Sequence, residues 1–174
     1  MQDMHARHLG LTERIASYYC EAAHVCLDRH HEPPTVFEIQ DAPSTSPVEV
    51  QWAPTDQHTR DAWANEIDTT EAGAYACVIA GVELVRAYFA VRRAETTTGA
   101  DYYLGPKGTG ADDLESCVRL EVSGMDEGSA PALAHRLAAK VRQAAAGASL
   151  LPAIAGVVGF EAKRILLADV PEQP

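Results

Sequence analysis

The sequence predicts an α+β protein, an α/β sandwich in which a small mixed sheet is flanked by helices. Segments with the apolar period of an amphipathic helix alternate with short segments of period two, and in the second half they follow in the order helix, strand, strand, strand, helix, strand. Hydrophobic and charged contents of 47% and 22% are ordinary for a globular protein and argue against disorder. At 174 residues the chain is long enough to bury a core as one domain.

The first helix is expected over residues 11–31. Thr12 can serve as its N-cap, with Glu13 in the first turn. Apolar residues recur at helical spacing at Leu11, Ile15, Tyr19, Ala22 and Cys26. Two prolines at positions 33 and 34 end the helix. The following PTVFEIQ alternates weakly, DAPSTSP is typical of a turn or linker, and VEVQW suggests a short edge strand.

The second helix is expected from Glu71 to about Ala87, with Thr69 or Thr70 as its cap. AYFAVRRAE then predicts a strand, TTTG a turn, and ADYYLGP the returning strand. In the next strand, CVRLEVS, the period of two is strict. Its residues divide into one face with Val118, Leu120 and Val122 and another with Cys117, Arg119, Glu121 and Ser123.

The last part of the chain predicts one more helix and a closing strand. The helix runs from about Ala130 to Ala146 and packs through Leu133, Leu137 and Val141. AGVVGFEAKRILLADV follows as one bent strand or two short ones. We therefore expect a core over residues 66–174, preceded over residues 1–65 by an N-terminal helix and β-edge extension.

The net charge of −11 disfavours tight non-specific binding of nucleic acid by the isolated chain, because phosphate binding draws on a surplus of Lys and Arg. The charge is unevenly spread along the sequence, however. Between Ser129 and Phe160 there is no Asp or Glu, while Arg136, Lys140 and Arg142 are present. A locally basic face is therefore expected on an acidic protein.

No membrane-spanning helix is expected, because the longest nearly uncharged stretch, residues 72–82, is about half the length that a span requires. The first residues contain no apolar run typical of a secretory signal. The four cysteines show no disulfide-framework spacing. We therefore expect a cytoplasmic protein with reduced thiols.

Two acidic residues carry the functional hypothesis. Asp101 and Glu121 lie on segments that are otherwise apolar, and neighbouring strands would hold their carboxylates side by side. Paired carboxylates suit Mg²⁺ or Mn²⁺ and make a metal site of the kind that phosphodiester-cleaving enzymes use. Each residue also has a simpler interpretation, in which Asp101 caps a hairpin turn and Glu121 is a solvent-facing residue of a half-buried sheet.

The same residues resemble the motifs of the PD-(D/E)xK nuclease superfamily, whose core has the order αβββαβ. The acid of the second strand stands here as Gly99-Ala100-Asp101, and the motif of the third strand as Glu121-Val122-Ser123. The resemblance covers residues 71–170. It implies a restriction-endonuclease-like core in which Mg²⁺ or Mn²⁺ is bound by Asp101 and Glu121. It also implies a third acid from the first core helix as a further metal ligand, which is Glu71 or, as the competing choice, Glu83.

The chain departs from this family at Ser123, which stands where the motif has a lysine. A short neutral serine cannot supply the cation that positions the attacking water. One explanation is that the lysine has moved to the following helix, where Arg136, Lys140 and Gln143 share one stripe at i, i+4 and i+7. Lys140 is then the expected replacement, and Gln143 would match a glutamine that some members place on this helix. The other explanation is that catalysis has been lost.

The resulting hypothesis is a metal-dependent nuclease acting on nucleic acid, most readily DNA. The residues expected in the catalytic centre are Asp101, Glu121, Ser123 and Lys140, and those expected to contact nucleic acid are Arg136, Gln143 and Tyr103. Arg92 and Arg93 could approach a phosphate, although basic residues on an edge strand more often prevent edge-to-edge association. The alternatives are a catalytically inactive binding or assembly subunit, with a homodimer or another protein as partner, and a small-molecule-binding protein of unrelated α+β fold.

Overall fold

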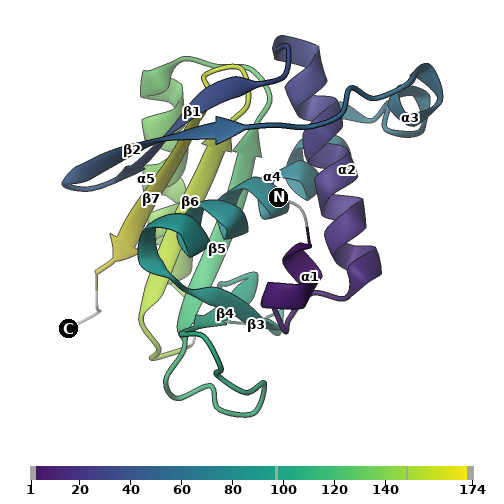
Figure 1. Ribbon diagram of the computed structural model, residues 1–174. Coiled ribbons are helices and arrows are strands. Elements are labelled where there is room, and N and C mark those ends of the chain that lie inside the picture. Colours follow the sequence, from purple (N-terminus) through teal and green to yellow (C-terminus); the bar gives the residue numbers. More distant parts are fainter. Residues whose placement is uncertain (1–2, 97, 148, 172–174) are drawn as a thin grey trace.

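A seven-stranded mixed sheet with helices on both faces forms the protein (Figure 1), as described by a computed structural model for residues 3–96, 98–147 and 149–171. The strand order is β2-β1-β7-β6-β5-β4-β3. The strands are β1 Thr35–Asp41, β2 Ser44–Val50, β3 Phe89–Arg93, β4 Tyr102–Gly105, β5 Val118–Met125, β6 Ala153–Gly159 and β7 Arg164–Val170. The helices of the described residues are α1 Met4–Arg7, α2 Glu13–His30, α3 Gln57–Ala62, α4 Glu66–Arg86 and α5 Ala130–Ala145. The predicted α+β class is confirmed.

The second half of the chain follows the predicted order of elements. After α4, strands β3, β4 and β5 pair antiparallel as consecutive neighbours. Helix α5 then leads to β6, which pairs parallel to β5. The closing segment is two strands, because β6 and β7 pair antiparallel around a short turn.

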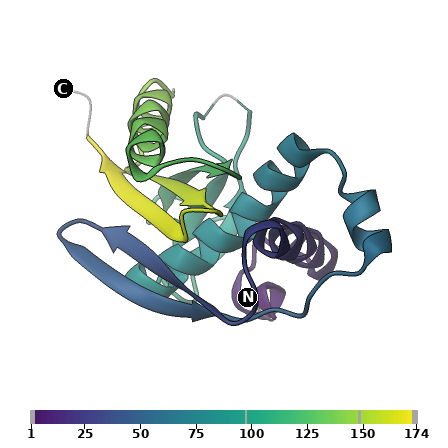
Figure 2. The same cartoon turned by 90° about the horizontal axis from the view of Figure 1, so that it is seen from above.

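Helices cover the two faces of the sheet unequally (Figure 2). Helix α5 packs on one face, over β5, β6 and β7, mainly through Leu133, Leu137 and Val141 as predicted. Helix α4 lies across the other face, and α2 packs on its outer side. A side chain at Gly73 would place its Cβ 2.9 Å from the backbone of Ala23, so these two helices approach closely. Helix α4 is therefore buried along most of its length.

Helix α2 confirms its prediction, including the N-cap. The Thr12 hydroxyl accepts a hydrogen bond from the backbone N–H of Ile15 at 3.3 Å. The interpretation of DAPSTSP as a turn or linker was wrong beyond its first residues, because β2 begins at Ser44 and pairs with β1 as a hairpin. Since β1 in turn pairs parallel to β7, the first 65 residues contribute two strands to the same sheet.

The predicted start of α4 was wrong by about one turn. The helix begins at Glu66, and the side chain of Asn65 accepts hydrogen bonds from the backbone N–H groups of Ile67 and Asp68. Thr69 and Thr70 are therefore buried within the helix and do not cap it. An N-cap asparagine followed by acidic residues is as strong a start signal as a threonine, and the apolar run alone placed the helix too late.

The four cysteines form no disulfide bonds among the described residues, as expected. Three of them, Cys26, Cys77 and Cys117, are buried, and burial raises the pKa of each thiol.

None of the described helices is both long enough and apolar enough to cross a membrane.

Candidate functional site

A cleft opens where β5 extends beyond its neighbour β4. Strand β4 pairs only with residues 118–120 of β5, whereas β6 pairs with β5 as far as Met125. From Val122 onward, the described residues place no strand on the β4 side of β5. The first half of α4 and the middle of α5 form the walls there. The cleft has a larger part of about 840 Å³ and an adjoining inner pocket of about 410 Å³.

The inner pocket collects residues from four separate parts of the sequence. It is lined by side chains of α4, of the segment from β3 to β4, of β5 and of α5. The charged residues among them are Glu71, Arg93, Asp101, Glu121 and Lys140. Asp101, Glu121 and Lys140, three residues of the predicted catalytic centre, are thus brought together although about 40 residues separate the first from the last in the sequence.

Glu121 is a buried carboxylate with a lysine as its partner. It lies in the middle of β5 on the face that α5 covers, and only 4% of the residue is exposed. The ammonium of Lys140 donates a hydrogen bond to its Oε1 at 2.7 Å and another to Oε1 of Gln143 at 3.1 Å. Burial raises the pKa of Glu121, while Lys140 opposes that rise. The simpler interpretation of Glu121 as a solvent-facing residue was therefore wrong, since α5 covers this face of the sheet.

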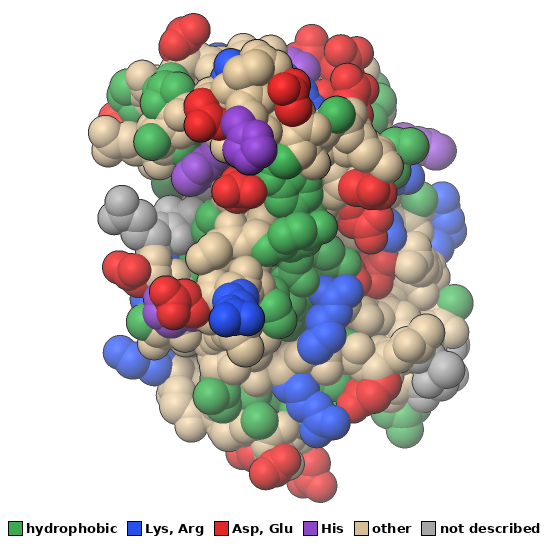
Figure 3. Space-filling model, turned by 90° about the vertical axis from the view of Figure 1, so that its right-hand side faces the viewer, with side chains coloured by type: hydrophobic (Ala, Val, Ile, Leu, Met, Phe, Trp, Pro, Cys, Tyr) green, Lys and Arg blue, Asp and Glu red, His purple; other side chains and the backbone are tan. Residues whose placement is uncertain are grey.

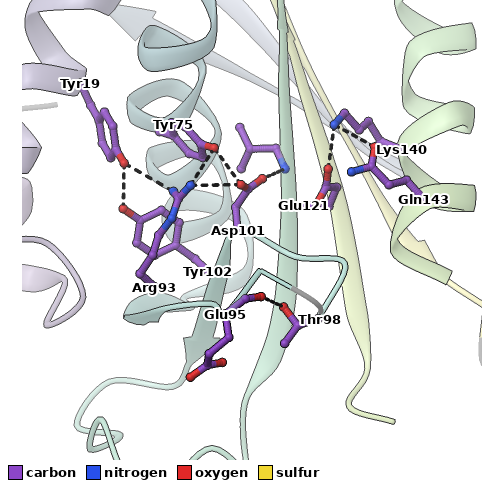
Figure 4. A network of polar contacts seen from close by, with 11 residues as sticks. Tyr19, Tyr75, Arg93, Glu95, Thr98, Asp101, Tyr102, Glu121, Lys140 and Gln143 are labelled. Atoms are coloured by element: carbon purple, nitrogen blue, oxygen red, sulfur yellow. Dashed lines mark hydrogen bonds and ion pairs between the residues drawn. The ribbon is translucent and has the colours of Figure 1, made fainter. Parts of the chain in front are cut away.

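Asp101 is held by three donors immediately before β4. Its Oδ1 accepts hydrogen bonds from the Tyr75 hydroxyl at 2.7 Å and from the Arg93 guanidinium at 3.3 Å. Its Oδ2 accepts from the backbone N–H of Val122 at 2.8 Å, on the unpaired side of β5. Figure 4 shows Asp101 and these partners on the α4 side of β5, with Glu121, Lys140 and Gln143 on the α5 side. The two carboxylates thus flank one edge of the strand.

Asp101 is close enough to Glu121 for its charge to affect the ionisation of Glu121. The charge of Asp101 adds to burial in raising the pKa of Glu121. No group of three or more His, Cys, Asp and Glu side chains with metal-binding geometry occurs in residues 3–96, 98–147 and 149–171. Two carboxylates are nevertheless what proteins commonly provide to Mg²⁺, which keeps several water ligands. Asp101 and Glu121 could therefore hold such an ion at the edge of β5.

Glu71 and Ser123 border the same cleft. Glu71 is exposed on α4 and lines both parts of the cleft. Ser123 lies two residues beyond Glu121 on β5, is 8% exposed and lines the larger part. Glu83, the competing choice for the helical acid, lies far from the cleft, where its carboxylate pairs with Arg7 and His8. Of the two choices for the helical acid, Glu71 is therefore the one that lies at the candidate site.

The predicted stripe on α5 faces the cleft. Arg136 is exposed and lines the larger part, while Lys140 and Gln143 line the inner pocket. The opposite wall, formed by α4, presents Glu66 and Glu71. Basic side chains on the surface also gather unevenly, and Figure 3 shows a band of Lys and Arg below the middle of one face, with acidic and histidine side chains toward its top.

Tyr103, expected to contact nucleic acid, lies away from the cleft. Tyr103 is 5% exposed and packs with Val91 and Cys117, and its hydroxyl donates to Glu95 at 3.1 Å. Tyr103 lines neither part of the cleft. Asp101 precedes β4, so the alternation of side chains along β4 does not place Asp101 and Tyr103 on the same face. Arg119 lies on the same face of β5 as Glu121, as the alternation predicts, and its buried guanidinium donates to three backbone carbonyls.

Sequence reasoning missed the donors that hold Asp101. Tyr75 occurs among apolar residues of α4, so its sequence context predicted no role at Asp101. Arg93 was assigned mainly to the protection of an edge strand. A buried tyrosine needs a partner for its hydroxyl, which was the one available signal for Tyr75. Strand β3 is indeed at the edge of the sheet, yet Arg93 turns toward Asp101.

Comparison with known proteins adds no residue to this site. No family model, curated protein or solved structure matches the chain. The function must therefore be argued from the geometry of the cleft and from the chemistry of its side chains.

Proposed function

We propose that the protein is a nuclease with a PD-(D/E)xK-like core that hydrolyses phosphodiester bonds of nucleic acid with Mg²⁺ or Mn²⁺. The observation that carries the proposal is the 2.7 Å contact between the ammonium of Lys140 and the carboxylate of Glu121. It provides, from α5, the cation that Ser123 cannot supply from β5. A lysine that reaches a buried carboxylate beside a second carboxylate is the arrangement that the relocated motif requires.

The topology supports the same proposal. The order α4, β3, β4, β5, α5, β6 repeats the αβββαβ order of the superfamily, with three antiparallel strands and a fourth that is parallel to the third. Asp101 directly precedes the second of these strands, and Glu121 lies on the third. Glu71 lies on the helix that precedes them. Each acid therefore lies on or directly beside the element to which the resemblance assigns it, which supports the proposal.

The partners of Asp101 are compatible with its use as a metal ligand. An ionised carboxylate can accept about four hydrogen bonds or ligand contacts, and the structure shows three on Asp101. Carboxylates that bind metals are themselves usually fixed by further hydrogen bonds. Tyr75 and the backbone N–H of Val122 provide such support. Glu121 likewise has one oxygen, Oε2, that accepts no hydrogen bond from the residues that the structure describes.

Each of the polar side chains of the cleft would have a separate role in phosphodiester hydrolysis. A bound Mg²⁺ or Mn²⁺ would polarise the phosphate and make water a better nucleophile. Lys140 favours the ionised form of Glu121, against the effect of burial, and lies where it can hold the attacking water. Gln143 fixes the direction of the ammonium. Glu71 can accept a proton from water at the mouth of the pocket. Arg136, exposed on the same wall, can bind a neighbouring phosphate of the substrate.

A second candidate function is a catalytically inactive subunit that acts through binding. The net charge of −11 and the serine at position 123 favour it. So does the pairing of Asp101 with Arg93, because a cation already neutralises that carboxylate. Such a protein would use the cleft or its sheet edges to contact a second copy of the chain or another protein.

Cleavage assays separate the two candidates. Supercoiled plasmid, single-stranded DNA, RNA and a branched duplex are each incubated with Mg²⁺, Mn²⁺ or EDTA. We expect metal-dependent cleavage that falls at least about 100-fold in Asp101→Asn and Glu121→Gln, the size of effect typical for removing a catalytic group. Glu127→Gln is the matched control, because Glu127 lines only the larger part of the cleft.

Two outcomes would contradict the proposal. Cleavage that survives in both Asp101→Asn and Glu121→Gln would show that the activity does not arise at this site. No cleavage of any substrate, together with no binding of Mn²⁺ by calorimetry, would favour the inactive binding subunit.

A further inference from the structure

Arg93 occupies an unusual position at the mouth of the inner pocket. Its guanidinium carbon lies 4.7 Å from the centre of the Tyr75 ring and 4.8 Å from that of the Tyr102 ring. One of its terminal nitrogens donates to the Tyr75 hydroxyl at 3.1 Å and to Asp101 at 3.3 Å, and the other contacts the Tyr19 hydroxyl at 3.4 Å. Two aromatic faces therefore hold a cation beside the carboxylate.

This arginine is held in place but not enclosed. Its side chain is 48% exposed, and it lines the same pocket as Glu121 and Lys140. A guanidinium has five N–H donors. Stacking on the aromatic faces fixes the plane of the guanidinium and uses none of these donors. The planar fork of Arg fits the oxygens of a phosphate well. Arg93 can therefore present donors to a ligand in the pocket while it stays on its aromatic support.

Asp101 does not depend on Arg93 for its orientation. The contact between the two residues, at 3.3 Å, is longer than the 2.7–2.9 Å usual for an ion pair with a hydrogen bond. The bonds from Tyr75 and from the backbone of Val122 are shorter, at 2.7 and 2.8 Å. Arg93 can therefore leave Asp101 while the carboxylate keeps its position.

A metal ion and Arg93 would compete for the same carboxylate. Both are positive, and Oδ1 of Asp101 already accepts two hydrogen bonds, one of them from Arg93. A metal ion that binds Asp101 would neutralise its carboxylate, so the guanidinium of Arg93 would no longer be attracted to it. The released guanidinium remains at the pocket mouth, where the phosphate of a bound strand would lie.

We infer that Arg93 is a substrate-binding residue that pairs with Asp101 in the free protein and moves to a phosphate of the nucleic acid when a metal ion binds Asp101. The inference rests on the proposed function and extends it to the order of binding. Metal and nucleic acid then bind cooperatively, because the metal frees the cation that the phosphate needs, and the coupling is the same from either side. Since Arg93 contacts phosphate and no base, its contribution is independent of sequence.

Arg92 provides a matched control for this role. It is the preceding residue of the same strand and is similarly exposed, at 46% of its side chain. Its guanidinium pairs with Glu95 at 2.9 Å, and it lines neither part of the cleft. Replacing it removes the same formal charge without touching Asp101.

The test compares Arg93→Gln, Arg93→Lys and Arg92→Gln with the wild-type protein, after thermal unfolding has shown that each variant is folded. Mn²⁺ affinity is measured by calorimetry without nucleic acid. Affinity for a labelled single-stranded DNA oligonucleotide is measured by fluorescence anisotropy, with and without Ca²⁺, over a range of salt concentrations.

We expect Arg93→Gln to bind Mn²⁺ about threefold to tenfold more tightly, because the competing cation is gone. It should bind the oligonucleotide about tenfold more weakly when Ca²⁺ is present, with a salt slope reduced by about one. Arg93→Lys should keep the salt slope but recover only part of the affinity, since a lysine lacks the planar fork. Arg92→Gln should leave Mn²⁺ affinity unchanged.

The results that would overturn the inference are distinct from those that would overturn the proposed function. If the wild-type protein binds both ligands and Arg93→Gln behaves like Arg92→Gln, the role of Arg93 is refuted and the nuclease proposal stands. Weaker Mn²⁺ binding by Arg93→Gln would also refute it. If the wild-type protein binds neither Mn²⁺ nor the oligonucleotide, both the proposed function and the role of Arg93 are refuted.

Discussion

Replacing Lys140 by methionine removes the cation that faces the buried Glu121 carboxylate and keeps an unbranched side chain of similar length. Only 6% of the Glu121 side chain and 19% of the Lys140 side chain are exposed. Water therefore cannot easily replace the lost ammonium. We expect the free energy of unfolding to fall in this variant, and to fall most at a pH at which Glu121 is ionised.

The size of the loss follows from the geometry. Two unit charges 2.7 Å apart attract each other by about 6 kcal/mol at an effective dielectric constant of 20. The cost of taking both charges out of water offsets much of this attraction. Hydrogen bonds to charged groups contribute about 1.5–3 kcal/mol net, so we expect Lys140→Met to cost about 2 kcal/mol near pH 8.

The pH dependence identifies the carboxylate as the cause. Burial already raises the pKa of Glu121, and removing Lys140 raises it further. As the pH falls through that raised value, Glu121 takes up a proton and no longer needs a cation. The difference in unfolding free energy between the wild-type protein and Lys140→Met should therefore shrink as the pH falls from 8 toward 5.

Urea unfolding of four proteins measures the effect directly. They are the wild type, Lys140→Met, Glu121→Gln and the double variant, each at several pH values. We expect a coupling free energy of about 2 kcal/mol at pH 8 and a smaller one at pH 5. A coupling near zero at pH 8, or a loss in Lys140→Met that does not change with pH, would refute the electrostatic account of this pair.

Three further predictions concern the surroundings of the site. Arg119→Met should lower the free energy of unfolding by about 3 kcal/mol in urea unfolding, because three backbone carbonyls lose their donor, and a neutral result would show that water replaces the guanidinium. Gly124→Ala should cost about 1–3 kcal/mol, since the new Cβ would lie 2.7 Å from the backbone oxygen of Thr70, and an unchanged melting temperature would contradict this tight packing of α4 on β5. Burial lowers the pKa of His8, and its Nδ1 accepts a hydrogen bond from the backbone N–H of Ala90. The unfolded chain therefore binds a proton at His8 more tightly than the folded chain does. Wild-type stability should therefore fall from pH 7 to pH 5.5, and the fall should be smaller in His8→Asn, whereas equal slopes would exclude His8 as its source.

Much of the fold could be predicted from local pattern. The helical period with an N-cap at Thr12 located α2, and the strict period of two located β5 and its two faces. The edge strand predicted at VEVQW overlaps the end of β2, but the first residues of β2 were missed because Pro, Ser and Thr give DAPSTSP no strand preference. The pairing with β1 stabilises this part of β2 instead. The start of α4 at Glu66 was missed because the segment before Glu71 is polar.

The site could be predicted only where strand order brought residues together. Asp101, Glu121 and Lys140 met because adjacent strands and a crossover helix follow one another along the chain. The period of two could not distinguish residues of the cleft from residues of the core, because both faces of β4 are buried, so Tyr103 was placed wrongly. The contact between Arg93 and Asp101 depends on the irregular register between β3 and β4, which no local pattern encodes.

The most direct test of the central claim is anomalous diffraction from crystals of the protein soaked in Mn²⁺. The account predicts a manganese peak at the edge of β5, about 2.2 Å from carboxylate oxygens of both Asp101 and Glu121, a distance close to that of Mg²⁺ from its ligands. It also predicts that the peak disappears in Glu121→Gln. A well-ordered cleft without a peak at saturating Mn²⁺, or a peak that touches neither carboxylate, would contradict the account.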